Sequence, residues 1–194
     1  MTGTSDERGR TESRLNERQQ QTLLRLARET IRQYVSDRSA PPLPEGDPEF
    51  LRERAVFVTL HKHGQLRGCI GSLEAHEPLA EAVRSSAISA ATRDPRFPPV
   101  SADEVDDVEI EISVLSPLER VERPEDIVVG IHGVMVADGM RRGVFLPQVA
   151  PEQGWDRDTM LCYLCAHKAG LPADAWRGDA ELHVFTTQVF SEAD

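Results

Sequence analysis

The sequence predicts an α+β fold with a mainly antiparallel sheet and flanking helices. Short segments rich in β-branched and other apolar residues, typical of strands, are interspersed with segments whose apolar residues recur at helical spacing. These segments do not follow the regular strand–helix–strand order of a doubly wound parallel sheet. Neighbouring strand segments are instead joined by short glycine-containing turns, which suit antiparallel hairpins.

The composition is that of an ordinary globular protein. The 194 residues fit one domain, and 39% hydrophobic with 28% charged residues is typical of soluble chains. No apolar run is long enough to span a membrane, and three cysteines, an odd number, suit a reducing compartment better than a disulfide framework. We therefore expect a cytoplasmic protein. A formal net charge of −11 argues against a broad nucleic-acid surface, so nucleic acid is not an expected partner.

The first half of the chain is expected to hold a tail and two helices beside a hairpin. Residues 1–16 have little that could be buried, so a disordered tail is expected there. Residues 17–36 place apolar side chains at helical spacing, whereas the proline-rich residues 40–48 are too interrupted for a regular element. A second helix should begin at Pro78, where the missing N–H costs nothing, and should end near Arg93 because a proline follows closely.

The second half is expected to hold most of the remaining strands and a last helix. Residues 101–104 match a capping box and predict one short helical turn, and residues 108–116 alternate apolar with polar side chains like a half-buried strand. Residues 133–147 predict a hairpin with an Asp-Gly turn, and residues 158–168 predict a helix that ends at a glycine. Further strands are expected at residues 127–129 and 181–190.

The hexapeptide LRGCIG at residues 66–71 carries the strongest functional signal. It follows the apolar strand 55–61 and a four-residue turn containing Gly64, so it should be the returning strand of a hairpin. Strand alternation then places Arg67 and Cys69 on the same face, roughly 7 Å apart. A guanidinium near a thiol favours the reactive thiolate, and the glycines at 68 and 71 allow a backbone or a ligand to come close. The alternative is that Cys69 is a small buried core residue.

A catalytic role for Cys69 needs a base, and its own hairpin offers none in this prediction. His61 should pair opposite Leu66 and so face away from Cys69. Candidates from elsewhere in the chain are His132, Glu109, Glu111 and Asp94.

The next charged residues of interest lie on the loop at residues 94–99, which its prolines make rigid. Asp94 and Arg96 are candidate ligand-binding groups, or alternatively an internal ion pair that holds the loop in shape. A Cys-x-x-Cys motif at Cys162 and Cys165 lies inside a predicted helix, and the sequence offers no second pair of metal ligands. We therefore expect the two cysteines to lie on a buried face of the helix and to bind no metal.

Several sequence blocks resemble the AMMECR domain family, known in prokaryotes as AmmeMemoRadiSam system protein A. The blocks are RGCIG at 67–71, DPRFPP at 94–99, EIEISVLS at 109–116, GVFLPQV at 143–149 and GW at 154–155. The resemblance implies one two-lobed α+β domain over residues 17–190, followed by a short tail at 191–194, with the hexapeptide near the cleft between the lobes. It also implies an association with a radical-SAM protein and a Memo-like protein, and it implies no established reaction.

Three functions follow from these residues. The first is a binding or accessory module of such a system, with an anion-binding cleft at the hexapeptide and ligand contacts from Arg67, Gly68, Gly71, Asp94, Arg96 and Glu111. The second is a cysteine-assisted enzyme in which Cys69 is catalytic and arginines hold a small anionic substrate, since arginine binds carboxylate or phosphate bidentately. The third is a scaffold whose hexapeptide only packs the core. No cofactor is expected, and whether the protein is an enzyme stays open at this point.

Overall fold

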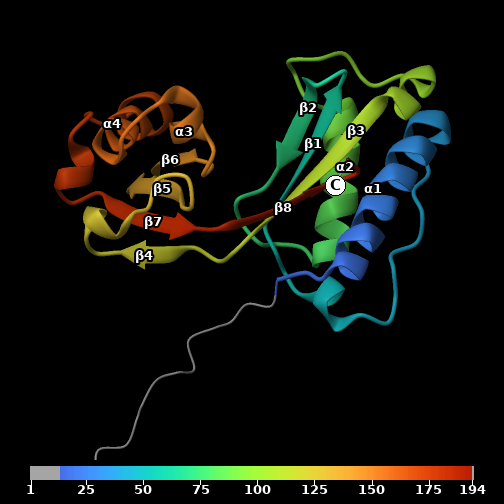
Figure 1. Cartoon of the computed structure of the whole chain (residues 1–194), viewed down its shortest axis with the longest axis horizontal. Coiled ribbons are helices and arrows are strands. Elements are labelled where there is room, and N and C mark those ends of the chain that lie inside the picture. Colours follow the sequence, from blue (N-terminus) through green and yellow to red (C-terminus); the bar gives the residue numbers. More distant parts are fainter. Residues whose placement is uncertain (1–13, 194) are drawn as a thin grey trace, which may run out of the picture.

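The computed structural model describes residues 14–193, which form two lobes side by side (Figure 1). Lobe 1 contains residues 14–115 and 187–193, and lobe 2 contains residues 118–185. Each lobe has one four-stranded antiparallel sheet with helices, so the predicted α+β class is confirmed. Residues 1–13 of the predicted tail lie outside the described residues.

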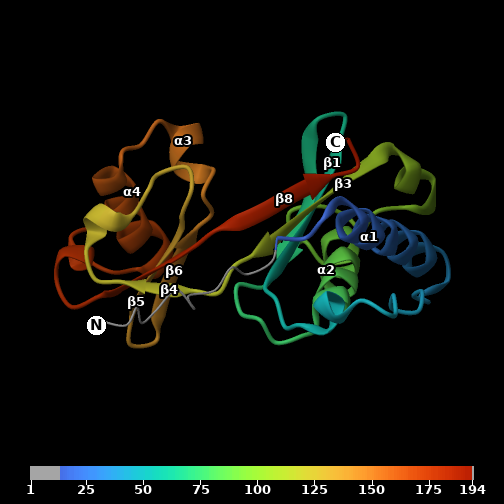
Figure 2. The same ribbon diagram turned by 60° about the horizontal axis from the view of Figure 1, so that its bottom comes forward.

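Lobe 1 has the strand order β2-β1-β3-β8. Its strands are β1 (Val56–Lys62), β2 (Gln65–Gly71), β3 (Val108–Leu115) and β8 (Thr187–Ser191). Its helices are α1 (Glu17–Asp37) and α2 (Leu79–Thr92), with short 3-10 segments at Pro48–Leu51 and Ala102–Asp107. Both α-helices contact the same sheet and each other, and Figure 2 shows them stacked on one side of it. We call the opposite face of this sheet the open face, and Cys69 of the candidate site lies on it.

The helix α1 forms where its periodicity predicts it. Asn16 and Gln19 make a reciprocal capping box at its start, which satisfies backbone N–H groups that would otherwise lack partners. Its buried stripe includes Leu23 and Ala27, and it ends where Arg38 adopts a left-handed conformation with φ of 66°. Leu15 is buried and exchanges two hydrogen bonds with the Gln188 side chain, so ordered contacts begin before the helix itself.

Lobe 2 has the strand order β4-β7-β5-β6. Its strands are β4 (Glu119–Val121), β5 (Gly133–Asp138), β6 (Arg141–Phe145) and β7 (Glu181–Phe185). Its helices are α3 (Val149–Gln153), α4 (Arg157–Tyr163) and a π-helix at Leu164–Ala169, with 3-10 segments at Pro124–Asp126 and Ala175–Arg177. The hairpin β5–β6 and the helix near residues 158–168 were predicted, although the second half of that helix is wound as a π-helix.

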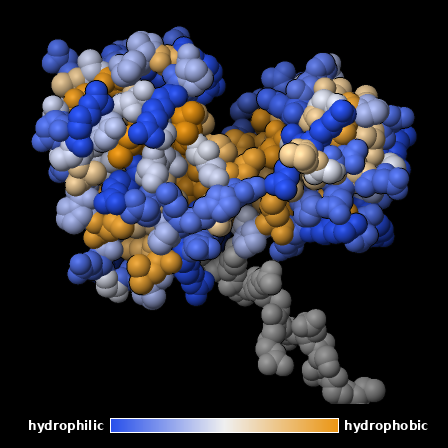
Figure 3. All heavy atoms as spheres, turned by 180° about the vertical axis from the view of Figure 1, so that it is seen from behind, coloured by the Kyte–Doolittle hydropathy of each residue, from blue (hydrophilic) through white to orange (hydrophobic). Residues whose placement is uncertain are grey.

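The lobes are joined by two segments, residues 116–117 and Thr186. The Ser116 N–H donates to the Thr186 carbonyl and the Thr186 N–H donates to the Ser116 hydroxyl oxygen, both at 2.9 Å. A small junction cluster of apolar residues lies between the lobes and consists of Ala55, Leu115 and Phe185 with Phe57, Leu73, Leu118, Val144 and Leu146 packed on them. Figure 3 shows a hollow between the lobes with hydrophobic residues at its base.

Three expectations about the elements are corrected. The predicted strand 181–190 is interrupted at Thr186, and its two halves, β7 and β8, belong to different sheets. The predicted strand at 127–129 is wrong, because Ile127 caps a 3-10 segment and the next residues form a turn. The short helical turn predicted at residues 101–104 does form, as the 3-10 segment Ala102–Asp107, but the Ser101 hydroxyl makes no capping hydrogen bond.

Two boundaries of the ordered region extend past those expected. Ordered contacts include Leu15 at the N-terminal side. On the C-terminal side, Ser191 ends β8, and Glu192 accepts a hydrogen bond from the Ile110 N–H while it pairs with Arg28. No helix in the described part of the chain is long and apolar enough to cross a membrane.

Candidate functional site

A β-bulge in the hairpin β1–β2 decides where Cys69 lies. His63 and Gly64 both have positive φ, 53° and 74°, which closes the tight turn that the sequence predicts. Beyond the turn His61 pairs with Leu66, but Leu60 pairs with Gly68, so Arg67 is an extra residue in β2. The register is shifted by one residue from this point onward.

That shift turns Cys69 to the open face of the sheet. In a regular hairpin in which His61 pairs with Leu66, Cys69 would lie opposite Val58, a fully buried residue on the helix-covered face. With the bulge it lies opposite Thr59. The prediction that His61 faces away from Cys69 is therefore wrong, because Thr59 and His61 are two positions apart on β1 and share its open face.

A polar row crosses the open face at Cys69. Thr59 lies between Cys69 on one side and Glu111 on the other, and Ser191 follows beyond Glu111. The Thr59 hydroxyl donates a hydrogen bond to Cys69 Sγ at 3.3 Å. Cys69, Thr59 and Glu111 are each half-buried, so the row is neither core nor fully exposed surface.

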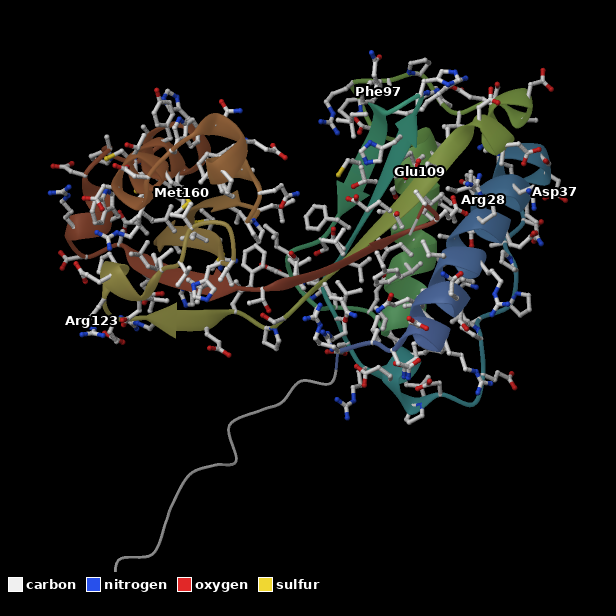
Figure 4. All side chains as sticks on the ribbon, in the orientation of Figure 1. Arg28, Asp37, Phe97, Glu109, Arg123 and Met160 are labelled. Atoms are coloured by element: carbon white, nitrogen blue, oxygen red, sulfur yellow. The ribbon has the colours of Figure 1, made fainter. Side chains whose placement is uncertain are left out.

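A second row lies directly beside the first. His61 pairs with Leu66 and with Glu109, whose position on β3 is labelled in Figure 4. His61 is therefore a diagonal neighbour of Cys69, a position whose Cβ atoms are typically roughly 7–8 Å apart. An imidazole and a thiol in such positions are close enough to interact through their side chains or one water.

The open face is turned toward lobe 2. Phe57, two positions before Thr59 on β1, lies on this face and belongs to the junction cluster together with Val144 and Leu146 of lobe 2. The row at Phe57 is thus covered by lobe 2, and the rows at Cys69 and His61 follow outward from it. This agrees with the expected position of the hexapeptide near the interlobe cleft.

Asp94 fastens the proline-rich loop to the outer edge of β2. Its Oδ2 accepts the Cys69 backbone N–H at 2.9 Å, and its two oxygens also accept the Nε and Nη2 of Arg96 at 2.9 and 2.7 Å. The side chain is 2% exposed. The hydrogen bond from Arg96 holds the pKa of Asp94 well below its usual range, and this effect outweighs the opposing effect of burial. Asp94 is therefore a fixed anion and a poor candidate for a base.

Arg67 is held in the same way by Glu104. Its Nε and Nη2 donate to the two Glu104 oxygens at 2.8 and 2.9 Å, and Lys62 donates to one of them at 3.2 Å. The bond from Arg67, helped by that from Lys62, lowers the pKa of Glu104 from 4.5 to about 2. The Arg67 charge is thus largely balanced within lobe 1.

Phe97 lies between the two guanidinium groups. Its ring centre is 6.0 Å from Cζ of Arg67 and 5.5 Å from Cζ of Arg96, within the range of cation–π contacts. Figure 4 shows Phe97 at the end of lobe 1 where the hairpin turn lies. Arg96 Nη2 also donates to the Cys69 carbonyl at 3.4 Å. The pKa of Arg96 is raised, mainly by its hydrogen bond with the Asp94 carboxylate.

Comparisons with known proteins show which family the chain belongs to. The family model described as AMMECR1 matches residues 24–190 of the chain. The chain belongs to the AMMECR1 family. A protein of Methanothermobacter thermautotrophicus is 46% identical over 179 residues, which are 88% of this chain and 93% of that protein. Protein TK0174 of Thermococcus kodakarensis is 43% identical and covers 88% of each chain.

A solved structure of the AMMECR1 family has the same fold. It is the crystal structure of the uncharacterized protein PH0010 from Pyrococcus horikoshii, with a TM-score of 0.79, 41% sequence identity, and coverage of 88% of this chain and 89% of that one. The fold and the family are thereby established for this chain.

The two glycines of the AMMECR1 hexapeptide have packing reasons. A Cβ on Gly68 would lie 2.3 Å from the Ala90 carbonyl oxygen of α2, and one on Gly71 would lie 2.2 Å from the Val56 carbonyl oxygen. Both contacts are with backbone, which has little room to shift. The close approach of α2 to Gly68 fixes the helix-covered side of β2, and Cys69 is thereby fixed on the other.

The remaining predicted residues lie elsewhere. His132 is in lobe 2, where its Nδ1 accepts a hydrogen bond from the Val128 N–H, so it is not a partner of Cys69. Cys165 is fully buried in the lobe 2 core, and burial raises the pKa of its thiol. Cys162 is half-buried beside it. Within residues 14–193 no three His, Cys, Asp or Glu side chains are grouped so that they could hold a metal ion.

Sequence reasoning missed three members of the site, namely Thr59, Glu104 and Phe97. Thr59 carries no signal until the register of the hairpin is known. Glu104 was assigned to a capping box from local spacing, and its partners Arg67 and Lys62 lie 37 and 42 positions away, so no local signal pointed to them. Phe97 stood inside the family block DPRFPP, and an aromatic residue beside an arginine on a rigid loop was the signal available.

Proposed function

We propose that this AMMECR1-family chain is a binding module that holds a small anionic ligand where residues 94–97 meet β2. The observation that carries the proposal is the pair of guanidinium groups flanking Phe97. Arg67 and Arg96 each use the Nε–Nη2 edge to bind a carboxylate. Within residues 14–193 neither Nη1 has a hydrogen-bond partner.

This geometry suits an anion that is recognised by shape as well as charge. Each arginine has further N–H donors beyond those its carboxylate uses, and both side chains are already ordered, so binding costs little additional side-chain entropy. Asp94 and Glu104 balance much of the positive charge, so we expect selective but modest affinity. Arg96 is 54% exposed, which leaves room for a ligand to approach.

The expected partners of the module are a radical-SAM protein and a Memo-like protein in the cytoplasm. These come from the resemblance to AmmeMemoRadiSam system protein A. In this proposal the module presents its ligand to such a partner from the edge of lobe 1 at which residues 94–97 meet β2.

A second function, a cysteine-assisted enzyme, is favoured by one specific observation. The bulge brings Cys69 beside Thr59, Glu111 and His61 on the open face. The Thr59 hydroxyl donates a hydrogen bond to the sulfur, and His61 places an imidazole on the same face as the sulfur, which the sequence did not predict. The substrate would again be a small anion held by Arg67 and Arg96.

A titration with inorganic phosphate and with citrate tests the first function. Amide chemical shifts should move saturably at Cys69, Arg96 and Phe97, and the Arg96→Met variant should bind at least about tenfold more weakly because a charge-assisted bidentate contact is lost. Arg123→Met is the matched control, because Arg123 also donates its Nε and Nη2 to an aspartate, Asp126, but in lobe 2. Equal weakening by both variants, or no saturable shift with either anion, would overturn the proposal.

One further variant separates the two functions. Cys69→Ser should keep anion binding in either case, since the sulfur is not an anion contact. If the protein is a cysteine-assisted enzyme, this variant loses any turnover of the bound anion, whereas for a binding module no turnover exists to lose.

A further inference from the structure

A cavity lies where the two lobes meet, beside both of the segments that connect them. It has a volume of about 400 Å³, which is within the usual range for ligand pockets. Lobe 1 contributes Arg54 and Val114 to its wall, and lobe 2 contributes Ile131 and Pro147. Ser116 and Thr186 of the connecting segments also line it. A ligand in this cavity would therefore contact both lobes at once.

The charged side chains of this cavity are all cationic. Within residues 14–193 they are Arg14 and Arg54, and no carboxylate or histidine of that range lines the cavity. The chain as a whole has a formal net charge of −11, so the sign of the cavity is opposite to that of the protein. A cavity lined by one sign of charge and walled by low-dielectric protein concentrates the field, and this one should attract anions.

Arg54 is the buried cation of the cavity. It is 9% exposed, and it donates from Nη1 to Glu49 at 3.2 Å and from Nε to the Leu115 carbonyl at 3.4 Å. Glu49 is also buried, and its other oxygen pairs with Arg52 at 3.3 Å. One carboxylate thus faces two guanidinium groups, so it offsets the charge of Arg54 only in part. An anion in the cavity would add to the compensation of this buried charge.

Arg14 supplies the second guanidinium group from the segment before α1. It is exposed, and it forms no ion pair with another residue of the described part of the chain. Thr186 and Thr187 border the same cavity, and each carries a hydroxyl that can donate a hydrogen bond. The Ser116 hydroxyl and the Gln188 side chain are engaged with the protein itself. The wall therefore combines two cations with hydroxyl donors.

We propose that this cavity binds a small phosphate monoester. The phosphate group pairs with Arg14 and Arg54 and accepts a hydrogen bond from Thr187, and the organic part rests on Val114 and Ile131. A phosphate monoester carries up to about two negative charges and three acceptor oxygens on one group, which suits guanidinium groups that come from two separate segments. A ligand held in this way links lobe 1 to lobe 2.

This cavity is distinct from two other places in lobe 1. Arg54 precedes β1, whereas Phe97 of the proposed anion site lies at the end of lobe 1 where the hairpin turn follows β1 (Figure 4). Arg54 also lines a smaller cavity of about 280 Å³ between β2 and α2, but Glu74 and Glu77 line that one as well, so its charges are of both signs. The inference does not rest on the proposed function.

Phenyl phosphate is the probe, and benzenesulfonate is its matched counterpart. Both have a ring and three terminal oxygens, but the sulfonate carries a single negative charge. We expect phenyl phosphate to cause saturable amide shifts at Gly130, Ile131 and Thr187 at neutral pH. Benzenesulfonate should bind at the same residues at least about fivefold more weakly, because one of the two charges is missing.

Two variants test the arginines, and a third is the control. Arg14→Met should weaken phenyl phosphate binding about tenfold, since it removes one guanidinium from an exposed position. Arg54→Lys keeps the buried charge that Glu49 needs but loses the planar fork, so it should also weaken binding. Arg18→Met removes an exposed arginine of α1 that does not line the cavity, and it should leave binding unchanged. Circular dichroism checks that each variant is folded.

Three results would each overturn the proposal. They are the absence of saturable shifts at Ile131 and Thr187, equal binding of benzenesulfonate and phenyl phosphate, and equal binding of phenyl phosphate by Arg14→Met and Arg18→Met. Arg96→Met separates this cavity from the proposed anion site, because it should remove shifts at Phe97 and leave those at Ile131. Failure of one site therefore leaves the shifts of the other in place.

Discussion

The backbone N–H of Cys69 donates to the buried carboxylate of Asp94 at 2.9 Å, although the two residues are 25 positions apart. This bond satisfies an outward-pointing N–H of β2, which is the edge strand of its sheet. It also sets the distance between the loop that carries Arg96 and the strand that carries Cys69. The position of the loop and that of the thiol therefore depend on one side chain.

Replacing Asp94 should loosen the site and destabilise lobe 1. Asp94→Ala leaves the Cys69 N–H and the Arg96 guanidinium without their partner, and we expect a loss of about 2–4 kcal/mol in the free energy of unfolding. Denaturant unfolding measures it. Asp126→Ala, which breaks the exposed pair with Arg123, is the control and should have little effect. A stability change at Asp94 no larger than the control would show that the loop is held by other contacts.

Acid should remove the contribution that the Arg67–Glu104 ion pair makes to the free energy of unfolding. The folded pKa of Glu104 is about 2 against an ordinary 4.5, so the pair stabilises the fold fully above about pH 4.5 and loses this contribution as the pH falls toward 2. The measurement is the free energy of unfolding against pH for wild type and Glu104→Gln. The difference between them should be largest near neutral pH and shrink below pH 4.5. A difference that stays constant with pH would contradict the assignment.

Cys69 should react in the native protein, and Thr59 should control the rate. In a Cys162→Ala, Cys165→Ala background Cys69 is the sole thiol, and its alkylation at neutral pH can be followed directly. Thr59→Val removes the hydrogen bond to the sulfur and should slow alkylation roughly two- to tenfold, the effect of about 0.5–1.5 kcal/mol. Arg96→Met should slow it more than Arg67→Met, because Arg96 Nη2 also donates to the Cys69 carbonyl.

The reciprocal variant is the control for that experiment. Cys69→Ala retains Cys162 and the buried Cys165, and it should label more slowly than the background in which Cys69 is the remaining thiol. A native Cys69 that reacts only after denaturant is added would support the scaffold function and remove the site.

Gly68 should tolerate no side chain. Gly68→Ala places a Cβ 2.3 Å from the Ala90 carbonyl oxygen, so α2 or β2 must move, and we expect a loss of about 1–3 kcal/mol. Gln65→Ala, an exposed position on the same strand, should change stability by no more than about 0.5 kcal/mol. Thermal and denaturant unfolding compare the two. Similar stability for both variants would show that the helix approaches β2 less closely than described.

The N-terminal residues should be removable up to a sharp limit. Deleting residues 1–13 should leave the melting temperature unchanged, since their composition offers little to bury. Deleting residues 1–16 also removes buried Leu15 and the Asn16 cap and should cost about 2–4 kcal/mol. A lower melting temperature for the shorter deletion would indicate that the first residues dock on the domain.

Elements with local causes were predictable. The helix α1, the turn at His63 and Gly64, the strand β3 and the hairpin β5–β6 follow from periodicity, capping and glycine positions within a few residues. The same reasoning found the hexapeptide, Asp94 and Arg96. It also anticipated that Asp94 and Arg96 could pair with each other.

The features that could not be predicted from the sequence depend on contacts between residues that are far apart in the chain. The bulge at Arg67 cannot be read from β2 alone, because the register is set by the turn on one side and by the approach of Gly68 to Ala90 on the other. For the same reason His61 was placed on the wrong face and Thr59 was missed. The local sequence around Glu104 predicts a capping box, but its carboxylate pairs with Arg67, which is 37 positions away in the chain.

The passage of β7 into β8 has a consequence for how the protein is made. β7 lies inside the sheet of lobe 2, between β4 and β5, and β8 completes the sheet of lobe 1. β7 and β8 are the last two strands in chain order within residues 14–193, and Thr186 alone separates them. During synthesis from the N-terminus, therefore, neither sheet can close until residues 181–191 have left the ribosome, and β4 has no neighbour to pair with until then. The edge of lobe 1 at β3 stays unpaired for the same time, although nearly all residues of lobe 1 emerge earlier. The two lobes are thus completed by one event, the emergence of β7 and β8, and a nascent chain stalled before these strands would hold two unfinished sheets.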